Sequence, residues 1–173
     1  GHRETLRRPS SEPCSYNRAM PEKRASRPHM PGYGIVPPAE GTGLLPWSWA
    51  EERLRTSHDY WLATVRPDGA PHVMPVWGVW LEDALWFSSG GRSRKARNLA
   101  EDPRCVLTTD RAAQPVVIEG AAEVVADQSR LRLFLDALND KYATTIELDF
   151  LDPSVNGCFR VSPRVVFALD EED

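Results

Sequence analysis

The stretch YWLATVRPDGAPHVMPVWGVWL, residues 60–81, decides the fold. Its first part, Tyr60 to Val65, is rich in aromatic and β-branched residues, which favour a strand. Pro67-Asp68-Gly69 then forms a typical tight turn, because proline fixes one backbone angle and glycine accepts a positive φ. A second strand runs from His72 to Leu81. This stretch therefore predicts an antiparallel β-hairpin.

The chain after the hairpin continues in short strands. A turn at Glu82-Asp83 leads into a third strand. Gly90-Gly91 ends that strand, and a short helix follows from Ser93 to Glu101. Pro103 stops the helix, because proline cannot continue it. Strands are expected at 84–88, 105–109, 115–126 and 158–169, with Pro163 implying a bulge or an edge in the last of them.

Two further helices are predicted on either side of this region. Pro46 suits a first helical turn, and the apolar positions that follow it have helical spacing. Asp127 is a plausible N-cap for a helix with apolar residues at Leu131, Phe134, Leu135 and Leu138. Residues 143–156 stay unassigned, because their apolar residues indicate burial while their aspartates and proline indicate a loop.

Six strands joined by tight turns, with no alternation of strand and helix, predict a mainly β fold: a six-stranded antiparallel barrel with flanking helices. A dinucleotide-binding domain is excluded, so Gly90-Gly91 is not a dinucleotide motif. Residues 1–31 contain five prolines and almost no apolar periodicity, which predicts a disordered or loosely ordered tail. The remainder, 32–173, is expected to form a single domain.

Charge and composition limit the possible partners. The tail has seven Lys or Arg against three Asp or Glu, whereas the remainder has 14 against 22. The remainder of the chain therefore has a net negative charge, which repels the phosphates of nucleic acid. Small molecules are the expected partners. No apolar run approaches the ~20 residues that span a bilayer, and we expect a cytoplasmic protein. Three widely spaced cysteines indicate free thiols rather than a metal site.

The turn before the second helix carries the most specific chemical signal. Arg92, Ser93, Arg94, Lys95 and Arg97 crowd the start of a helix directly after a strand. A helix N-terminus offers free N–H groups and a positive dipole end, so these residues could form a phosphate site. From the residues alone, solvated charges on a surface turn explain the pattern equally well.

A resemblance favours the phosphate site. Residues 61–77, 85–99 and 101–107 resemble the pyridoxamine 5′-phosphate oxidase-like superfamily of flavin and deazaflavin oxidoreductases, in an actinobacterial-type branch. The resemblance covers roughly residues 46–170 and implies a split β-barrel. It implies that Ser93, Arg94 and Lys95 hold the cofactor phosphate, with Ser88 and Ser89 close to it. It also implies that the ring system lies along Val73, Met74, Pro75, Val76 and Trp77.

Departures from the family pattern argue against oxidation of vitamin B6 itself. Pro115 stands where the oxidases have a flavin-contacting glutamine, and their arginine-rich C-terminal segment is missing. The resemblance leaves FMN and coenzyme F-420, a deazaflavin, as equal candidates for the cofactor. Arg92 and Arg97 would suit the acidic tail of the deazaflavin.

The expected function is hydride transfer between the bound cofactor and a small organic substrate, in a homodimer with cofactor sites at the interface. Two alternatives remain: a protein that stores flavin, deazaflavin or haem without turnover, and a basic turn that serves only dimer contacts. No catalytic residue is assigned, and His58 and His72 stay uncommitted.

Overall fold

A computed structural model describes residues 24–27 and 43–171. The chain divides into two units, Gly1–Gly41 and Thr42–Asp173, and the second contains all the helices and strands described below. Almost all of the tail predicted at 1–31, and Cys14 within it, lies outside the described residues. In the described part of the chain, no helix is both long and apolar enough to cross a membrane.

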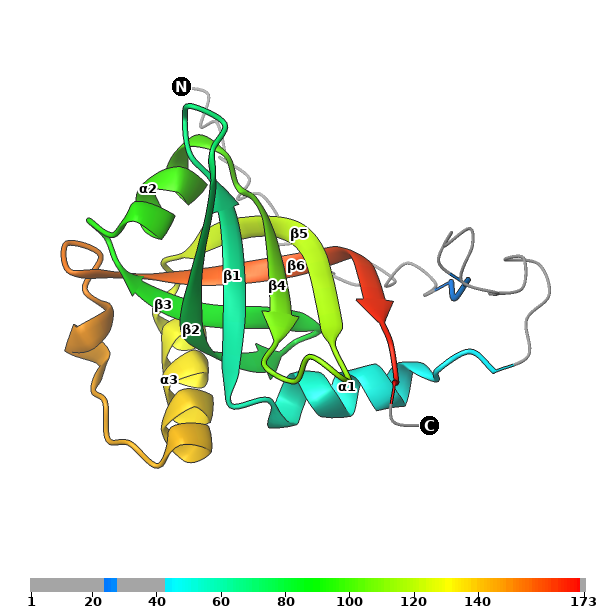
Figure 1. Cartoon of the computed structure of the whole chain (residues 1–173). Coiled ribbons are helices and arrows are strands. Elements are labelled where there is room, and N and C mark those ends of the chain that lie inside the picture. Colours follow the sequence, from blue (N-terminus) through cyan, green and yellow to red (C-terminus); the bar gives the residue numbers. More distant parts are fainter. Residues whose placement is uncertain (1–23, 28–42, 172–173) are drawn as a thin grey trace, which may run out of the picture. The chain divides into compact units, whose positions relative to one another are not determined.

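Six antiparallel strands close into a barrel in the order β1-β2-β3-β6-β5-β4 (Figure 1). This confirms the mainly β fold. The strands are β1 Asp59–Val65, β2 Pro71–Leu81, β3 Ala84–Gly90, β4 Arg104–Thr109, β5 Val116–Val125 and β6 Asn156–Ala168.

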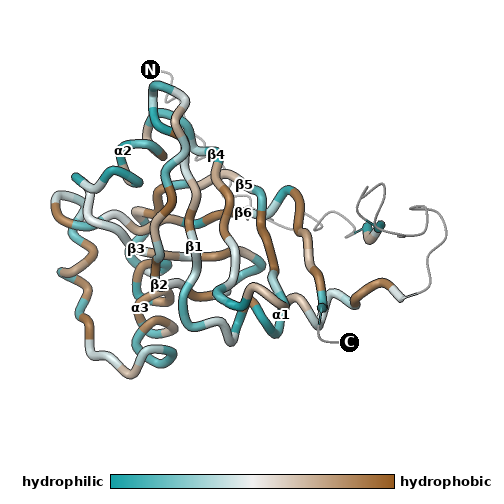
Figure 2. Tube along the Cα trace, in the orientation of Figure 1, coloured by the Kyte–Doolittle hydropathy of each residue, from teal (hydrophilic) through white to brown (hydrophobic). Residues whose placement is uncertain are grey.

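The predicted hairpin is confirmed and sets the two faces of β1. Its register runs from Asp59 opposite Trp77 to Val65 opposite Pro71. Because side chains alternate along a strand, Leu62 is buried inside the barrel while Trp61 lies on the outer surface. Figure 2 shows hydrophobic residues among the strands of the barrel.

The helices are α1 Trp47–Thr56, α2 Arg94–Glu101 and α3 Gln128–Tyr142. Asp127 caps α3, as expected, by accepting a hydrogen bond from the backbone N–H of Arg130. The buried face of α3 packs on the outside of β3, where the rings of Phe134 and Trp86 stack 6.2 Å apart. The unassigned stretch contains a 3₁₀ helix, Leu148–Leu151, which Leu151 anchors in the same cluster.

The bulge that Pro163 implied is present in β6. Gly120 pairs with Pro163 while Glu119 pairs with Val165, so β6 has one extra residue here. The strands approach closely at this point, because a Cβ built on Gly120 would lie 2.4 Å from the carbonyl oxygen of Ser162. Cys105 and Cys158 are free and buried, and burial raises the pKa of each thiol to about 12.

Candidate functional site

The N-terminus of α2 has the geometry of an anion site. Ser93 is its N-cap, and its Oγ accepts a hydrogen bond from the Ala96 N–H at 3.2 Å. The Ser93 N–H in turn donates to the Gly90 carbonyl at 2.9 Å, which closes the turn from β3. The N–H groups of Arg94 and Lys95 lie in the first helical turn, where no intrahelical acceptor exists. They are available to a phosphate.

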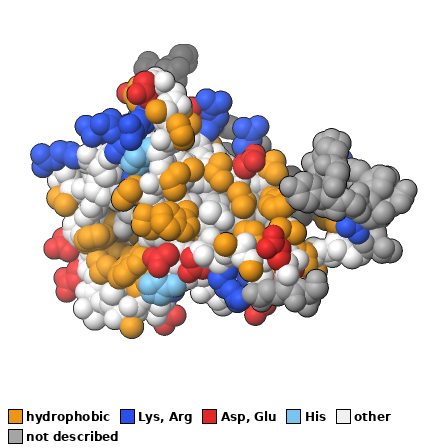
Figure 3. All heavy atoms as spheres, viewed as in Figure 1, with side chains coloured by type: hydrophobic (Ala, Val, Ile, Leu, Met, Phe, Trp, Pro, Cys, Tyr) orange, Lys and Arg blue, Asp and Glu red, His pale blue; other side chains and the backbone are white. Residues whose placement is uncertain are grey.

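Four cationic side chains come from the turn before α2 and from the first part of the helix. Arg92, Arg94 and Arg97 are exposed, and Lys95 is half-buried. None of the four forms an ion pair with another residue of 43–171. Figure 3 shows basic side chains gathered at the edge where Figure 1 places α2. Burial lowers the pKa of Lys95. These cations have no acidic partner among the described residues, and the phosphate of a ligand would supply the missing negative charge.

The two serines at the end of β3 take different positions. Ser89 is buried, and its Oγ lies 2.9 Å from the Oγ of Ser93. Ser88 is one residue earlier, so it shares the opposite face of β3 with Trp86, on the α3 side. The structure therefore brings Ser89 to the α2 N-terminus and does not bring Ser88 there.

Asn98 fixes α2 to the barrel. This side chain is fully buried, and its Nδ2 donates to the Oγ of Thr64 on β1 at 2.9 Å. Its Oδ1 has no hydrogen-bond partner among the residues that the structure describes. Sequence reasoning missed this residue, because its partner lies 34 residues earlier in the chain. The bond holds α2 against β1.

The predicted ring-binding residues lie on both faces of β2. Val73, Pro75 and Trp77 point outward and are exposed, Val73 to 50% and Trp77 to 45%. Val76 is buried in the barrel core with Leu62 and Leu107. Met74 lies two residues before Val76 and therefore faces the same side of β2, but its side chain is 43% exposed. Only the outward residues and Met74 are accessible to a ligand.

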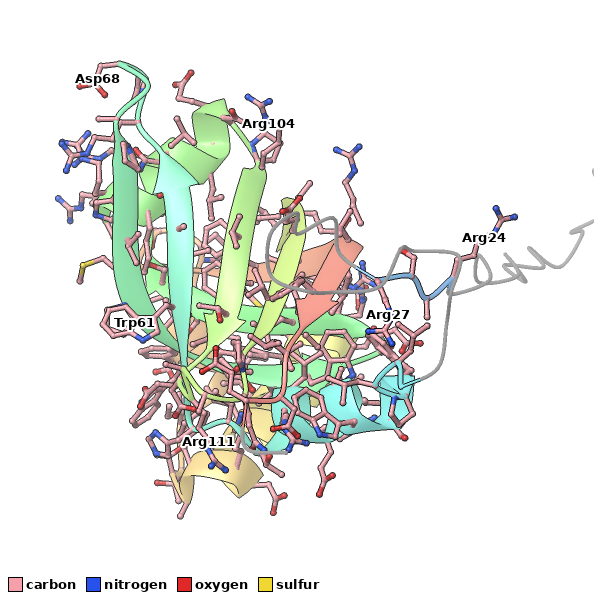
Figure 4. The ribbon with its side chains drawn as sticks, turned by 45° about the vertical axis from the view of Figure 1, so that its right-hand side comes forward. Arg24, Arg27, Trp61, Asp68, Arg104 and Arg111 are labelled. Atoms are coloured by element: carbon pink, nitrogen blue, oxygen red, sulfur yellow. The ribbon has the colours of Figure 1, made fainter. Side chains whose placement is uncertain are left out.

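The outward face of β2 continues across the neighbouring strands as an apolar surface. Strand register places Pro75 beside Trp61, Trp61 beside Thr108, and Thr108 beside Val117. Trp61 is 46% exposed. In Figure 4 it lies on β1 toward the end opposite the hairpin tip marked by Asp68, and Figure 3 shows hydrophobic side chains over this face. We call this the outer apolar face; its exposed members are Trp61, Val65, Val73, Pro75, Trp77 and Val165.

Three aromatic rings form a cluster around Trp77, at one end of the outer apolar face. The rings of Trp77 and Tyr142 are parallel, with centroids 4.4 Å apart, and the His58 ring stands edge-on to both. His58 also lines an open cleft of about 460 Å³ between α1 and the loop after β4. Sequence reasoning did not find this cluster, because its members come from three distant segments.

The end of α3 holds this cluster against β2. The Nζ of Lys141 donates to the Gly78 carbonyl at 2.8 Å and to the Tyr60 hydroxyl at 2.9 Å. Burial lowers the pKa of Lys141 from its usual 10.5 to about 8, and raises the pKa of Tyr142 to about 12. The pKa of Tyr60 is also raised, chiefly by burial.

A family model described as pyridoxamine 5′-phosphate oxidase matches residues 50–170, which include all six strands, α2 and α3. The chain belongs to the pyridoxamine 5′-phosphate oxidase family. The match confirms the resemblance inferred from the sequence. A comparison with curated proteins found no match.

Solved structures of similar fold include proteins of different function. A conserved hypothetical protein from Mycobacterium tuberculosis is 23% identical over 74% of this chain and 86% of that one, with a TM-score of 0.65. A protein named F420 reductase is 26% identical over 71% of this chain and 98% of that one, with a TM-score of 0.57. A haem storage protein from Vibrio cholerae is 19% identical over 70% of this chain and 90% of that one, with a TM-score of 0.57.

The residues present fit the flavin-type cofactor that this family binds. The two first-turn N–H groups, the paired hydroxyls of Ser89 and Ser93 and the unpaired cations suit a phosphate. The exposed residues of β2 offer an apolar strip for a flat ring. A cofactor with both features would contact residues from α2 and β2.

Proposed function

We propose that this protein is an oxidoreductase that transfers hydride between bound FMN or coenzyme F-420 and a small organic substrate. The observation that carries the proposal is the α2 N-terminus, which combines two free N–H groups with cations that form no ion pair among the described residues. Strand β2 adds an exposed apolar strip. The cofactor supplies the hydride chemistry when bound. The protein's own residues bind the phosphate, orient the ring and exclude water.

The proposal takes Ser93, Arg94 and Lys95 as the phosphate ligands, with Ser89 behind them. Arg94 and Lys95 donate charge-assisted hydrogen bonds, and the serine hydroxyls and backbone N–H groups complete the site. Val73, Met74, Pro75 and Trp77 contact the ring system. Val76 contributes through its main chain, because its side chain lies in the core.

Two observations favour the deazaflavin over FMN. One similar structure, at 26% identity, is named F420 reductase. Arg92 and Arg97 are exposed next to the phosphate site, where they would meet further negative charge on a cofactor with an acidic tail. The proposal predicts that coenzyme F-420 binds more tightly than FMN, and that salt weakens its binding more strongly.

Titration of the purified protein with both cofactors tests the proposal. Binding of either one below roughly millimolar Kd, an affinity of about 4 kcal/mol, supports it. Binding of neither would refute it. Binding without turnover of any electron acceptor would instead support a storage protein. Mass spectrometry of protein purified from a deazaflavin-producing host identifies the resident cofactor directly.

We further propose that two copies of the chain pair through the outer apolar face, so that each cofactor lies between two barrels. The face includes the ring-binding strand, and exposed apolar patches of this kind mark interaction sites. A homodimer with twofold symmetry would use the same face on both copies and create two equivalent sites.

Light scattering tests the dimer. The wild-type protein should have twice the monomer mass of 19.4 kDa at micromolar concentration. Trp61→Asp places a charge in the centre of the outer apolar face and should give a monomer. Leu133→Asp, at a similarly exposed apolar residue on α3, should leave the mass unchanged. A monomeric wild-type protein would contradict this part of the proposal.

A further inference from the structure

Strand β2 has one paired edge and one open edge over its first half. On one side, residues 71–77 pair with β1. On the other side, β2 pairs with β3 only from Gly78 onward, and the last residues of β3 pair only with β6. Within the described part of the chain, no strand pairs with residues 71–77 on this second side, which we call the open edge of β2. Main-chain groups that point to the open edge are available to a ligand.

The hydrogen bonds of the hairpin show which residues point to the open edge. The Arg66 N–H donates to the Ala70 carbonyl at 2.9 Å, so these two residues form a bonded pair across the strands. Bonded and non-bonded pairs alternate in an antiparallel ladder, so Thr64 and His72 form the next bonded pair. The residues between the bonded ones, at positions 71, 73 and 75, therefore direct their main-chain groups away from β1 and toward the open edge.

The far end of the strand and its prolines fit this pattern. The Gly78 N–H points to the β1 side, where it donates to the Tyr142 hydroxyl beside the His58 carbonyl. Pro71 and Pro75 both lie at positions that face the open edge. Proline has no N–H, so a strand tolerates it only where no ladder bond is needed. This explains how β2 contains two prolines and still pairs with β1 along its length.

The open edge has more hydrogen-bond acceptors than donors. Residues 71, 73 and 75 each present a carbonyl there, but only Val73 also presents an N–H. Beside Pro75 the edge has a carbonyl and no donor. A ring that lies along β2, as the proposed function requires, would bring its own polar atoms to this edge. An acceptor atom beside Pro75 would lose its hydrogen bond to water and gain none from the protein.

FMN and the deazaflavin differ in such an acceptor. Atom 5 of the oxidised flavin ring is a nitrogen, whose lone pair accepts a hydrogen bond. In a deazaflavin this atom is a carbon that carries a hydrogen, and it accepts none. An edge without a donor at this point therefore costs FMN a hydrogen bond that the deazaflavin never makes. The rest of the flat three-ring frame is shared, so the apolar strip of β2 suits both cofactors equally.

We infer that Pro75 is a cofactor-specificity residue, which favours the deazaflavin because it removes the main-chain N–H that could bind the ring nitrogen of FMN. This inference rests on the proposed function. It concerns the main chain of Pro75, which points along the sheet to the open edge. The Pro75 side chain projects from the sheet onto the outer apolar face, so both parts of the residue have separate roles.

Equilibrium binding of two matched probes to the cofactor-free protein tests the inference. The probes are FMN and 5-deaza-FMN, which carry the same phosphate and differ only at atom 5. The wild-type protein should bind 5-deaza-FMN at least about fivefold more tightly than FMN, the smallest effect expected for an acceptor left without a donor. Calorimetry gives both Kd values without any turnover. Equal Kd values for the wild type would overturn the inference.

Substitution of Pro75 tests the residue itself. Pro75→Val adds an N–H at the open edge and keeps an apolar, strand-favouring side chain. The preference for 5-deaza-FMN should fall at least about threefold, chiefly through tighter binding of FMN. Pro75→Ala adds the same N–H with a smaller side chain and should give the same change. A strand that only becomes looser would change both Kd values together, so their ratio isolates the effect of the donor.

Pro71→Val is the matched control. It adds an N–H to the same edge four residues earlier and should leave the preference unchanged. If Pro71→Val lowers the preference as much as Pro75→Val does, the assignment to Pro75 is overturned.

Two further outcomes separate this inference from the proposed function. If both probes bind but the wild type and both Pro75 variants have the same preference, Pro75 does not set specificity and the proposed function stands. If neither probe binds, and coenzyme F-420 does not bind either, the proposed function fails first and this inference fails with it.

Discussion

Replacing Arg94 or Lys95 by alanine tests the phosphate site most directly. The expected change is a loss of cofactor affinity with little loss of stability. A charge-assisted hydrogen bond contributes about 1.5–3 kcal/mol, so each variant should bind roughly ten- to a hundredfold more weakly. The two losses need not add, because both side chains would contact the same phosphate.

The structure sets the expected effect on folding. Arg94 is exposed and has no ion pair among the described residues, so Arg94→Ala should change the unfolding free energy by less than about 0.5 kcal/mol. Lys95 is half-buried, and removing its apolar stem should cost slightly more. Both changes also relieve repulsion among the crowded cations of α2. The cofactor-free variants should therefore melt close to the wild type.

Two measurements on each variant check the prediction: a cofactor titration by fluorescence and a thermal melt without cofactor. Arg132→Ala, at an exposed arginine of α3, is the matched control and should bind like the wild type. Raised salt should weaken binding by the wild type more than by the double variant, because screening acts on the charges that were removed.

One pattern would refute the reasoning. If Arg94→Ala and Lys95→Ala bind the cofactor normally but lose several kcal/mol of stability, these side chains support the fold and do not bind phosphate. Normal binding with normal stability would equally place the phosphate elsewhere.

Three further predictions concern stability. Asn98→Ala removes the buried bond to Thr64 and should lower the unfolding free energy by about 1–3 kcal/mol in urea titrations, with weaker cofactor binding as α2 loosens. The folded state holds the Lys141 proton less tightly than the unfolded state, so stability should rise between pH 8 and 10; Lys141→Met should flatten that rise in melts across this range. Gly120→Ala forces a Cβ against the Ser162 carbonyl and should lower the melting temperature by several degrees, as calorimetry would show.

The strands and turns were predictable because their signals are local. The hairpin of residues 60–81 follows from β-branched residues, a proline and a glycine, all within a few positions of one another. The bulge at Pro163 and the cap at Asp127 were likewise evident from single residues, because each reflects what one side chain does to its own backbone. The 3₁₀ helix at Leu148–Leu151 was not assigned, because local polarity and burial gave opposite signals there.

Strand alternation was predictable in principle but did not decide which of the site residues are accessible. Ser88 and Ser89 are neighbours with the same side chain, yet only Ser89 meets Ser93. Likewise Val76 points into the core while Val73 is exposed. A shift of one residue reverses a side chain's direction, and only the barrel's closure fixes which face is inside.

The sequence by itself determined the mainly β class, the hairpin, the capped helices and the basic helix start, because each rests on contacts within a few residues. It also carried the family resemblance, whose motifs are continuous in the chain. Only the tertiary structure decided that Asn98 anchors α2 to Thr64, and that His58, Trp77 and Tyr142 form one cluster. These contacts join residues 19 to 84 positions apart. The closing of the barrel brings them together, and no local pattern encodes their distance or direction.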